Sequence, residues 1–194
     1  NKMRYLRIIL LALAAVPFLS SCGYNTMVEQ SEAVDAQWAQ VENVYQRRAD
    51  LIPNLVATVK GYAEHEQETL TAVIEARAKA TSLTLDASNL TEENMAQFQA
   101  AQEGLSQALQ RLMLVHEQYP DLKANEQFRD LQVQLEGTEN RISTERNRFN
   151  EAARAYNTTI KKFPTNFIAS WFNFEPKAYF KAEEGAQNAP KVEF

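Results

Sequence analysis

Apolar residues recur every three or four positions over most of the chain, which is the period of an α-helix with one buried face. From residue 25 to residue 80 these positions stay in phase and continue across Pro53. Because proline lacks an amide hydrogen and disfavours helical geometry just before it, we expect a kink or break between residues 49 and 53, with Asp50 capping a restarted helix. The segment is predicted to be one long kinked helix or two nearly collinear helices. The apolar positions are Met27, Val34, Trp38, Val41, Tyr45, Ile52, Leu55, Val59, Tyr62, Leu70, Val73 and Ile74.

Two more helices are predicted after the first polar loop, at residues 81–89. Thr91, with Asn94 three residues later, indicates a capped helix that ends at Tyr119, before the turn at Pro120. Its predicted inward residues are Met95, Phe98, Leu105, Leu109, Leu112 and Val115. The last helix has the most regular pattern and ends near Pro164. Its predicted inward residues are Phe128, Leu131, Leu135, Thr138, Ile142, Glu145, Phe149, Ala152, Tyr156 and Ile160.

Composition supports an all-α fold. The chain has only five glycines and lacks the valine-, isoleucine- and tyrosine-rich runs of strands, whereas residues that favour helices dominate. Short connections favour antiparallel neighbours. We therefore expect an elongated antiparallel helical bundle with a long kinked N-terminal helix.

The segment 165–194 has to be interpreted separately. Residues 166–174 are dense in aromatic side chains without clear helical spacing. Trp171, Phe172 and Phe174 either cap the bundle core or form an exposed aromatic patch that contacts a partner or the membrane interface. Pro176 is expected to open a short helix through Glu184, followed by a polar tail.

Residues 1–21 have the layout of a secretory signal peptide. Three basic residues precede an apolar run from Ile8 to Leu19, and small residues stand before Cys22, the single cysteine. Leu19-Ser20-Ser21-Cys22 resembles a bacterial lipobox, which implies cleavage before Cys22 and acylation of its thiol. The alternative is a retained signal-anchor helix, although the apolar run is shorter than the roughly 20 residues of a membrane span and contains Pro17. Both interpretations place residues 22–194 outside the cytoplasm, facing the periplasm or the cell exterior.

Charge limits the partners of the exported domain. Without residues 1–21 the chain has 17 basic and 25 acidic residues, a formal charge of −8. An acidic domain argues against nucleic acid and against electrostatic adhesion to anionic lipid. Membrane attachment is therefore expected through the N-terminal lipid.

The sequence offers no catalytic or metal site. His65 and His116 each stand alone, and neither completes a Glu-x-x-His motif. Acylation would remove Cys22 from thiol chemistry and from metal binding, and no glycine-rich phosphate loop is present. We expect no cofactor, no metal and no enzymatic activity.

The most unusual polar cluster surrounds Pro53. Arg48 falls on the apolar face of its helix, and a buried charge needs a partner. One hypothesis pairs Arg47 or Arg48 with Asp50, Glu145 or another inward acid, which would fix the register of the bundle. The alternative is an anion-binding or partner-docking site. Its candidate residues are Arg47, Arg48, Asp50, Pro53 and Asn54.

Two blocks of sequence resemble the LemA family of bacterial proteins. The first is the run from Arg47 to Val56 with residues 58–62 and 68–70, and the second extends from Tyr156 to the final residues 189–194. The resemblance implies a membrane-associated, mostly helical protein of four-helix type, with predicted coiled coil and no established enzymatic activity. Family members often have glycine where this chain has Asn173. Asparagine tolerates a positive φ, so we expect the turn to be kept.

These observations favour a lipid-anchored interaction or scaffold protein of the cell envelope, with a protein partner or self-association. The alternatives are an enzyme accessory or small-anion-binding protein that uses residues 47–54, and a self-assembling protein that remodels membranes. The identity of the partner, the oligomeric state and the choice of inner or outer membrane do not follow from the sequence.

Overall fold

The computed structural model describes the backbone of residues 2–181 and the side chains of residues 23–181. All regular elements in this part of the chain are helical, which confirms the all-α prediction. The helices are α1 (Lys2–Tyr62), α2 (Gln67–Ser82), α3 (Glu92–Val115), α4 (Pro120–Ala124), α5 (Glu126–Lys161) and α6 (Thr165–Trp171), with a 3-10 turn η1 (Ala87–Asn89) before α3.

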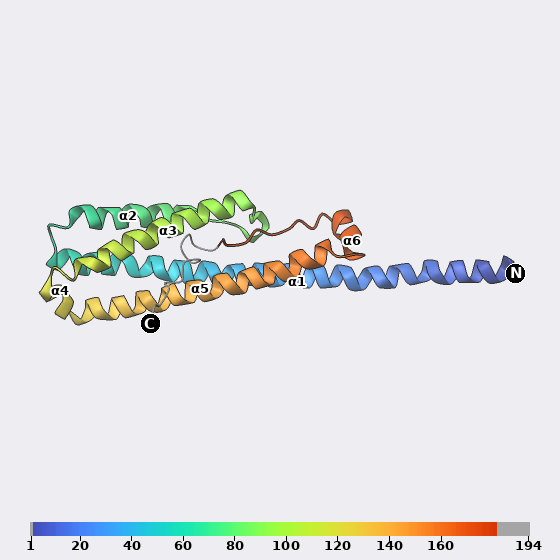
Figure 1. Ribbon diagram of the computed structural model, residues 1–194, viewed down its shortest axis with the longest axis horizontal. Coiled ribbons are helices and arrows are strands. Elements are labelled where there is room, and N and C mark those ends of the chain that lie inside the picture. Colours follow the sequence, from blue (N-terminus) through green and yellow to red (C-terminus); the bar gives the residue numbers. More distant parts are fainter. Residues whose placement is uncertain (1, 182–194) are drawn as a thin grey trace, which may run out of the picture.

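The four long helices form an elongated antiparallel bundle (Figure 1). Helix α5 packs along α1, and α3 packs along α2. Helix α2 also packs on α1, whereas α3 and α5 make almost no direct backbone contact. The first part of α1 projects beyond α6 at one end of the bundle (Figure 1).

Pro53 does not break α1, which continues to Tyr62, so the alternative with two helices divided at this proline is wrong. The carbonyl of Ala49 would normally accept a hydrogen bond from the amide of residue 53, which proline lacks. Arg77 on α2 donates its Nε–H to this carbonyl instead, at 2.8 Å. The prediction that Asp50 caps a restarted helix was wrong, because the helix does not restart and Asp50 accepts a bond from Gln46 Nε2 at 2.7 Å.

The predicted continuation of the first helical segment to residue 80 was wrong. The chain turns back at residues 63–66, where the Glu66 amide bonds to the Ala63 carbonyl at 3.1 Å, and α2 runs antiparallel to α1. Ile74, expected to face inward, is 53% exposed. The apolar residues keep their helical spacing after the turn, because α2 also buries one face against the bundle. The spacing alone therefore does not reveal that the chain reverses direction.

The other two predicted helices are found, although α3 ends at Val115 and not at Tyr119, and Pro120 begins the short helix α4, which was not predicted. All six predicted inward residues of α3 are buried, and Thr91 caps this helix by accepting a bond from the Asn94 amide at 3.3 Å. Asn125 caps α5 in the same way through the Phe128 amide. Two predicted inward residues of α5, Glu145 and Ala152, are only half-buried.

The core consists of two apolar clusters that meet near Arg48. One cluster contains the aromatic residues Trp38, Phe98, Phe149 and Phe180, and the other is largely aliphatic, with Leu55, Leu105, Leu112 and Leu135 among its members. In the first cluster the indole N–H of Trp38 donates to the Leu85 carbonyl at 3.1 Å. The buried charge of Arg48 therefore lies between the two apolar clusters of the core.

The C-terminal segment differs from its prediction. Residues 165–171 form the short helix α6, which was not predicted. Asn173 follows with a φ of 55°, which confirms the expected positive φ. Residues 174–181 are not helical, so the predicted helix from Pro176 is wrong over this range, and its remainder lies outside the described residues.

Candidate functional site

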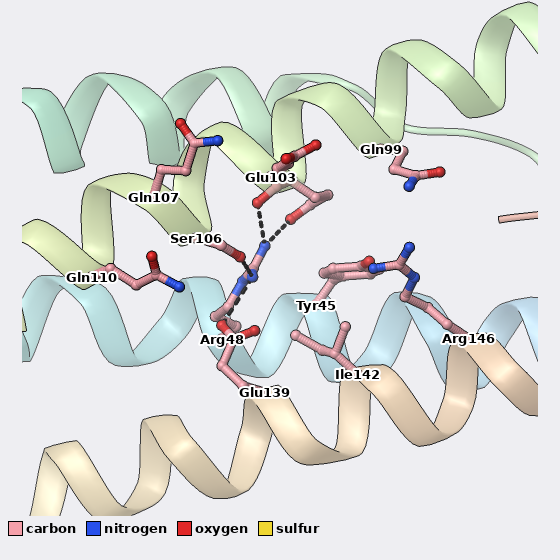
Figure 2. Close-up of a pocket in the computed structure, with 11 residues that line it drawn as sticks. Tyr45, Arg48, Gln99, Glu103, Ser106, Gln107, Gln110, Glu139, Ile142 and Arg146 are labelled. Carbon is pink, nitrogen blue, oxygen red and sulfur yellow. Dashed lines mark hydrogen bonds and ion pairs between the residues drawn. The ribbon is translucent and has the colours of Figure 1, made fainter. Parts of the chain in front are cut away.

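The buried side chain of Arg48 connects three helices (Figure 2). It projects from α1 and is 1% exposed. Its guanidinium donates to Ser106 Oγ at 2.7 Å, to Glu139 Oε1 at 2.9 Å, and to both the side-chain and backbone oxygens of Gln102 at 2.5 and 3.1 Å. The guanidinium also lies 5.2 Å from the centre of the Tyr45 ring. Arg48 thus links α1 to α3 and α5. Its charge lies on the apolar face of α1, where a buried charge needs an acidic partner, and such a partner is present.

That partner is Glu139, and neither Asp50 nor Glu145 fills the role. Glu145 accepts bonds from Gln37 at 2.6 Å and from Arg148 at 3.0 Å. Because Glu139 is 39% exposed, water reaches part of its carboxylate and reduces the cost of burying the pair.

The five predicted cluster residues do not form one site. Arg47, Asp50, Pro53 and Asn54 are exposed, while Arg48 points to the interior. Nη1 and Nη2 of Arg48 bond to protein oxygens, whereas its buried Nε has no hydrogen-bond partner among the described residues. The structure thus separates one structural residue from four surface residues.

A cavity of about 270 Å³ opens above Arg48, between α3 and α5 (Figure 2). A more open depression of about 680 Å³ continues it along the same two helices. We call the two together the α3–α5 groove. Near Arg48 its lining is mainly polar, and farther along it becomes more apolar. The polar part contains Gln99, Glu103, Ser106, Gln107, Gln110, Glu139 and Arg146, and the apolar part contains Met113, Leu114 and Leu135.

Residues 174–181, which we call the strap, run along α5 past η1 and reach α3 at Gln99, where the groove begins. Three side-chain amides hold its backbone, each accepting from a strap N–H and donating to the carbonyl of the same residue, at 2.8 to 3.1 Å. The pairs are Asn157 with Lys177, Asn150 with Phe180, and Gln99 with Lys181. The strap is therefore bound as an extended chain, through backbone hydrogen bonds that do not depend on its sequence.

Apolar and charged contacts also hold the strap. Phe180 is 5% exposed and stacks on Trp38, with ring centres 6.0 Å apart. Arg146 lies 5.0 Å from the Phe180 ring centre and donates to the Lys181 carbonyl at 3.0 Å. Lys177 donates to the Ala87 carbonyl at 2.8 Å. Lys181, the last described residue, is thus held by Gln99 and Arg146, both of which line the open groove.

The charge of Lys177 also acts on Asp86. The pKa of Asp86 lies below its ordinary value, because the backbone amide of Ser88 and then its hydroxyl donate to the carboxylate, with a smaller attraction from Lys177. Asp86 caps η1 through these bonds to Ser88.

Sequence reasoning missed the amides that hold the strap. Asn157 is 3% exposed, and Asn150 is half-buried. Both lie beside apolar positions of α5, where a buried amide needs hydrogen-bond partners. Their position beside the predicted apolar faces was the available signal, but it does not identify a distant segment as the partner.

The three predicted aromatic residues separate. Phe174 turns inward, 5.7 Å from the Tyr24 ring and 6.5 Å from the Tyr156 ring between centres. Trp171 is 85% exposed and Phe172 58%. Phe174 therefore packs against the core, whereas Trp171 and Phe172 are exposed, and their contact with a partner or the membrane stays a prediction.

The structure describes some of the remaining predicted features. The side chain of Cys22 lies outside the described residues, so its acylation stays a prediction. None of the helices, as far as they are described, has an apolar stretch suited to crossing a membrane. Among the described residues no three His, Cys, Asp or Glu side chains gather as metal ligands. His65 is exposed, and His116 bonds to the Met113 carbonyl and lies 5.6 Å from the Phe128 ring centre.

Comparison with known proteins agrees with this architecture. The chain is 29% identical to magnetosome protein MamQ 2 of Paramagnetospirillum magneticum, over 93% of this chain and 73% of that protein. It is 27% identical, over the same shares, to MamQ of Magnetospirillum gryphiswaldense. It is 25% identical to protein LemA of Metamycoplasma hominis, over 81% of this chain and 68% of that one. Residues 37–194, which include the helices that form the groove and the strap that enters it, match the LemA family, and the chain belongs to that family.

Proposed function

We propose that this membrane-associated protein is a non-catalytic interaction module of the bacterial envelope. The α3–α5 groove is its binding surface, and an extended polypeptide segment of a partner protein is the ligand. The observation that carries the proposal is the strap, because the protein already binds one segment of chain along α5 that reaches α3 at Lys181, where the open groove begins. In the described part of the chain no three His, Cys, Asp or Glu side chains gather as metal ligands, and the names of the relatives describe no enzymatic activity.

The open part of the groove has the size and chemistry for an extended segment. From Gln99 to Leu114 helix α3 rises about 22 Å, a length that about seven residues of extended chain would span. Gln107 and Gln110 are exposed on this part of α3, so their amides are available for backbone hydrogen bonds like those made by Gln99. Leu114 is 59% exposed and offers an apolar contact for a ligand side chain.

The charge of the groove favours a segment of a partner protein as its ligand over residues 182–188 of the protein itself. The open groove carries the carboxylates of Glu103, Glu136 and Glu139, while its two arginines already contact protein groups. Residues 182–188 have the sequence Ala-Glu-Glu-Gly-Ala-Gln-Asn, with two acids and no large apolar side chain. A segment with basic and large apolar residues complements the groove better, because it pairs with the carboxylates and covers Leu114.

Anchoring is the second part of the proposal. Acylation of Cys22 after removal of residues 1–21 would hold the bundle on the membrane, facing the periplasm or the cell exterior. Two or three acyl chains are sufficient for stable attachment without a membrane-spanning helix. Cys22→Ser is expected to abolish labelling with radioactive palmitate and to leave an unprocessed precursor. Full labelling of the variant would refute acylation at this residue.

The anion-binding alternative has less support, because Nη1 and Nη2 of Arg48 already bond to Ser106, Gln102 and Glu139. No specific contact among the described residues favours membrane remodelling by self-assembly.

Selection from a random peptide library displayed on phage tests the groove. We expect the full-length protein in detergent to enrich peptides in which large apolar residues alternate with lysine or arginine. Leu114→Glu should weaken the selected peptides at least tenfold. Ile74→Glu is the matched control, since Ile74 is an equally exposed apolar residue on α2 and its replacement should leave binding unchanged.

Two results would contradict the proposal. One is failure to enrich any peptide, and the other is binding that Leu114→Glu does not weaken. A variant that ends at Lys181 separates the two possible occupants. If peptides bind only to this shortened variant, the protein's own tail occupies the groove and the partner is excluded.

A further inference from the structure

Four aromatic side chains in or next to α6 are exposed, and α6 lies at the end of the bundle from which α1 projects (Figure 1). Phe163 is 80% exposed, Phe167 65%, Trp171 85% and Phe172 58%. We call these four residues the aromatic end patch. Phe163 and Phe167 contact each other edge to face, with ring centres 6.1 Å apart. Large apolar side chains gathered at this exposure are uncommon on a protein that meets only water.

The aromatic end patch lies against the start of the exported domain. A side-chain carbon placed on Gly23 would be 3.1 Å from Thr165 Cγ2 and 3.3 Å from Ile168 Cδ1, so α6 packs directly on α1 at this residue. The Tyr24 and Phe172 rings are 4.8 Å apart. Gly23 immediately follows Cys22 and is four residues after the apolar run that ends at Leu19, about 6 Å along the helix. Any membrane that holds the N-terminal segment therefore reaches this end of the bundle first.

The local charge suits a lipid surface even though the whole domain is acidic. Residues 161–174 contain Lys161 and Lys162 and no carboxylate. Both lysines are exposed beside Phe163. Tryptophan and phenylalanine prefer the boundary between headgroups and acyl chains, and lysines next to them attract anionic headgroups. Exposed Glu175 follows this range, so the repulsion expected from the net charge of −8 is reduced at this end and not abolished.

We propose that the aromatic end patch inserts into the lipid headgroup region and forms a second, non-covalent contact between the bundle and its membrane. The ligand is the lipid surface itself. A single anchor at Cys22 leaves the bundle free to swing, whereas a second contact at α6 fixes its orientation and directs the far end of the groove away from the bilayer. The inference rests on the membrane-anchoring part of the proposed function and is independent of peptide binding in the groove.

Fluorescence quenching by brominated lipid tests this contact. The full-length protein is reconstituted into vesicles of phosphatidylethanolamine and phosphatidylglycerol with brominated acyl chains. The chain has two tryptophans, and Trp38 is 1% exposed and lies about 22 Å along α1 from Gly23. Quenching therefore reports on Trp171. We expect the wild-type protein to lose at least a third of its emission relative to vesicles without bromine, and Trp171→Phe to lose almost none.

A displaced tryptophan provides the matched control. Val133 is 67% exposed on α5 and lies about 42 Å along that helix from Lys161. In the Trp171→Phe background, Val133→Trp should not be quenched. If the wild-type protein floats with the vesicles but Trp171 is not quenched, the aromatic contact is refuted while the anchor stands. If the protein does not float with the vesicles, the anchor itself fails. Equal quenching at positions 133 and 171 would also refute an oriented contact.

Discussion

Arg77 on α2 donates a hydrogen bond to the backbone carbonyl of Ala49 on α1, at 2.8 Å. Ala49 precedes Pro53 by four residues, so its carbonyl has no amide partner within the helix. A side chain from the neighbouring helix fills the vacant position. This bond gives the Ala49 carbonyl a hydrogen-bond donor in place of the amide that Pro53 lacks. It also connects α2 to α1.

Removing this bond should destabilise the fold. We expect Arg77→Met to reduce the free energy of unfolding by about 1–2 kcal/mol, because a half-buried carbonyl loses a charged donor. Urea unfolding followed by circular dichroism measures the change.

The Pro53→Ala background provides the control for this prediction. Alanine restores an amide at position 53, and this amide can bond to the Ala49 carbonyl. The cost of Arg77→Met should then fall to less than half. The same cost in both backgrounds would show that Arg77 acts through something other than the carbonyl that Pro53 leaves open.

The bonds of Arg48 predict a larger effect. Arg48→Met removes the donor from the buried side-chain and backbone oxygens of Gln102, and it should cost about 2–4 kcal/mol. Arg47→Met is the matched control, because Arg47 is exposed and its replacement should change stability by less than about 0.5 kcal/mol. Thermal and urea unfolding of both variants would decide. An Arg48→Met protein as stable as the wild type would refute the structural role.

The strap should depend on Asn157. Asn157→Ala removes two hydrogen bonds to the backbone of Lys177 and one to the Tyr179 hydroxyl, and we expect a loss of about 2–3 kcal/mol. Limited proteolysis should then cut within residues 174–181 faster than in the wild type. Asn147→Ala, at an exposed position of the same helix, should leave both measurements unchanged. Slow cleavage of the strap in Asn157→Ala would contradict the importance of the amide pairs.

Asp86 predicts a pH dependence with a defined sign. Its pKa in the folded protein lies below the ordinary value of 3.8, mainly because Ser88 donates to the ionised carboxylate. The ionised form therefore favours folding. Its contribution is complete above the ordinary pKa and is lost as the pH falls through the lower folded value. We expect Asp86→Asn to be less stable than the wild type at neutral pH and the difference to vanish on acidification. A difference that does not change with pH would contradict this.

The sequence predicts the helices better than their connections. The apolar period identifies the buried faces of α3 and α5, because those helices are long and flanked by clear caps such as Thr91. The turn at residues 63–66 was missed because it contains neither proline nor glycine. In addition, Leu70 and Val73 remain in phase with α1 while packing from an antiparallel helix.

The site was predictable only in part. Arg48 stands out because a charge occupies an apolar position, and periodicity detects such an exception. The α3–α5 groove and the strap depend on pairs far apart in the sequence, such as Gln99 with Lys181. No local pattern encodes these pairs. The role of Phe174 as a core residue and of Trp171 as an exposed one depends on the turn at Asn173, which the resemblance indicated but periodicity did not.

The most direct test of the central claim is a paramagnetic relaxation measurement on the complex with a peptide selected from the library. A spin label on the peptide should broaden the side-chain amide resonances of Gln107, Gln110 and Asn140, which border the open part of the α3–α5 groove. The amide of Gln46, on an exposed part of α1, should stay sharp. Broadening at Gln46 with sharp resonances at Gln107 and Gln110 would show that extended segments bind elsewhere and would contradict the account.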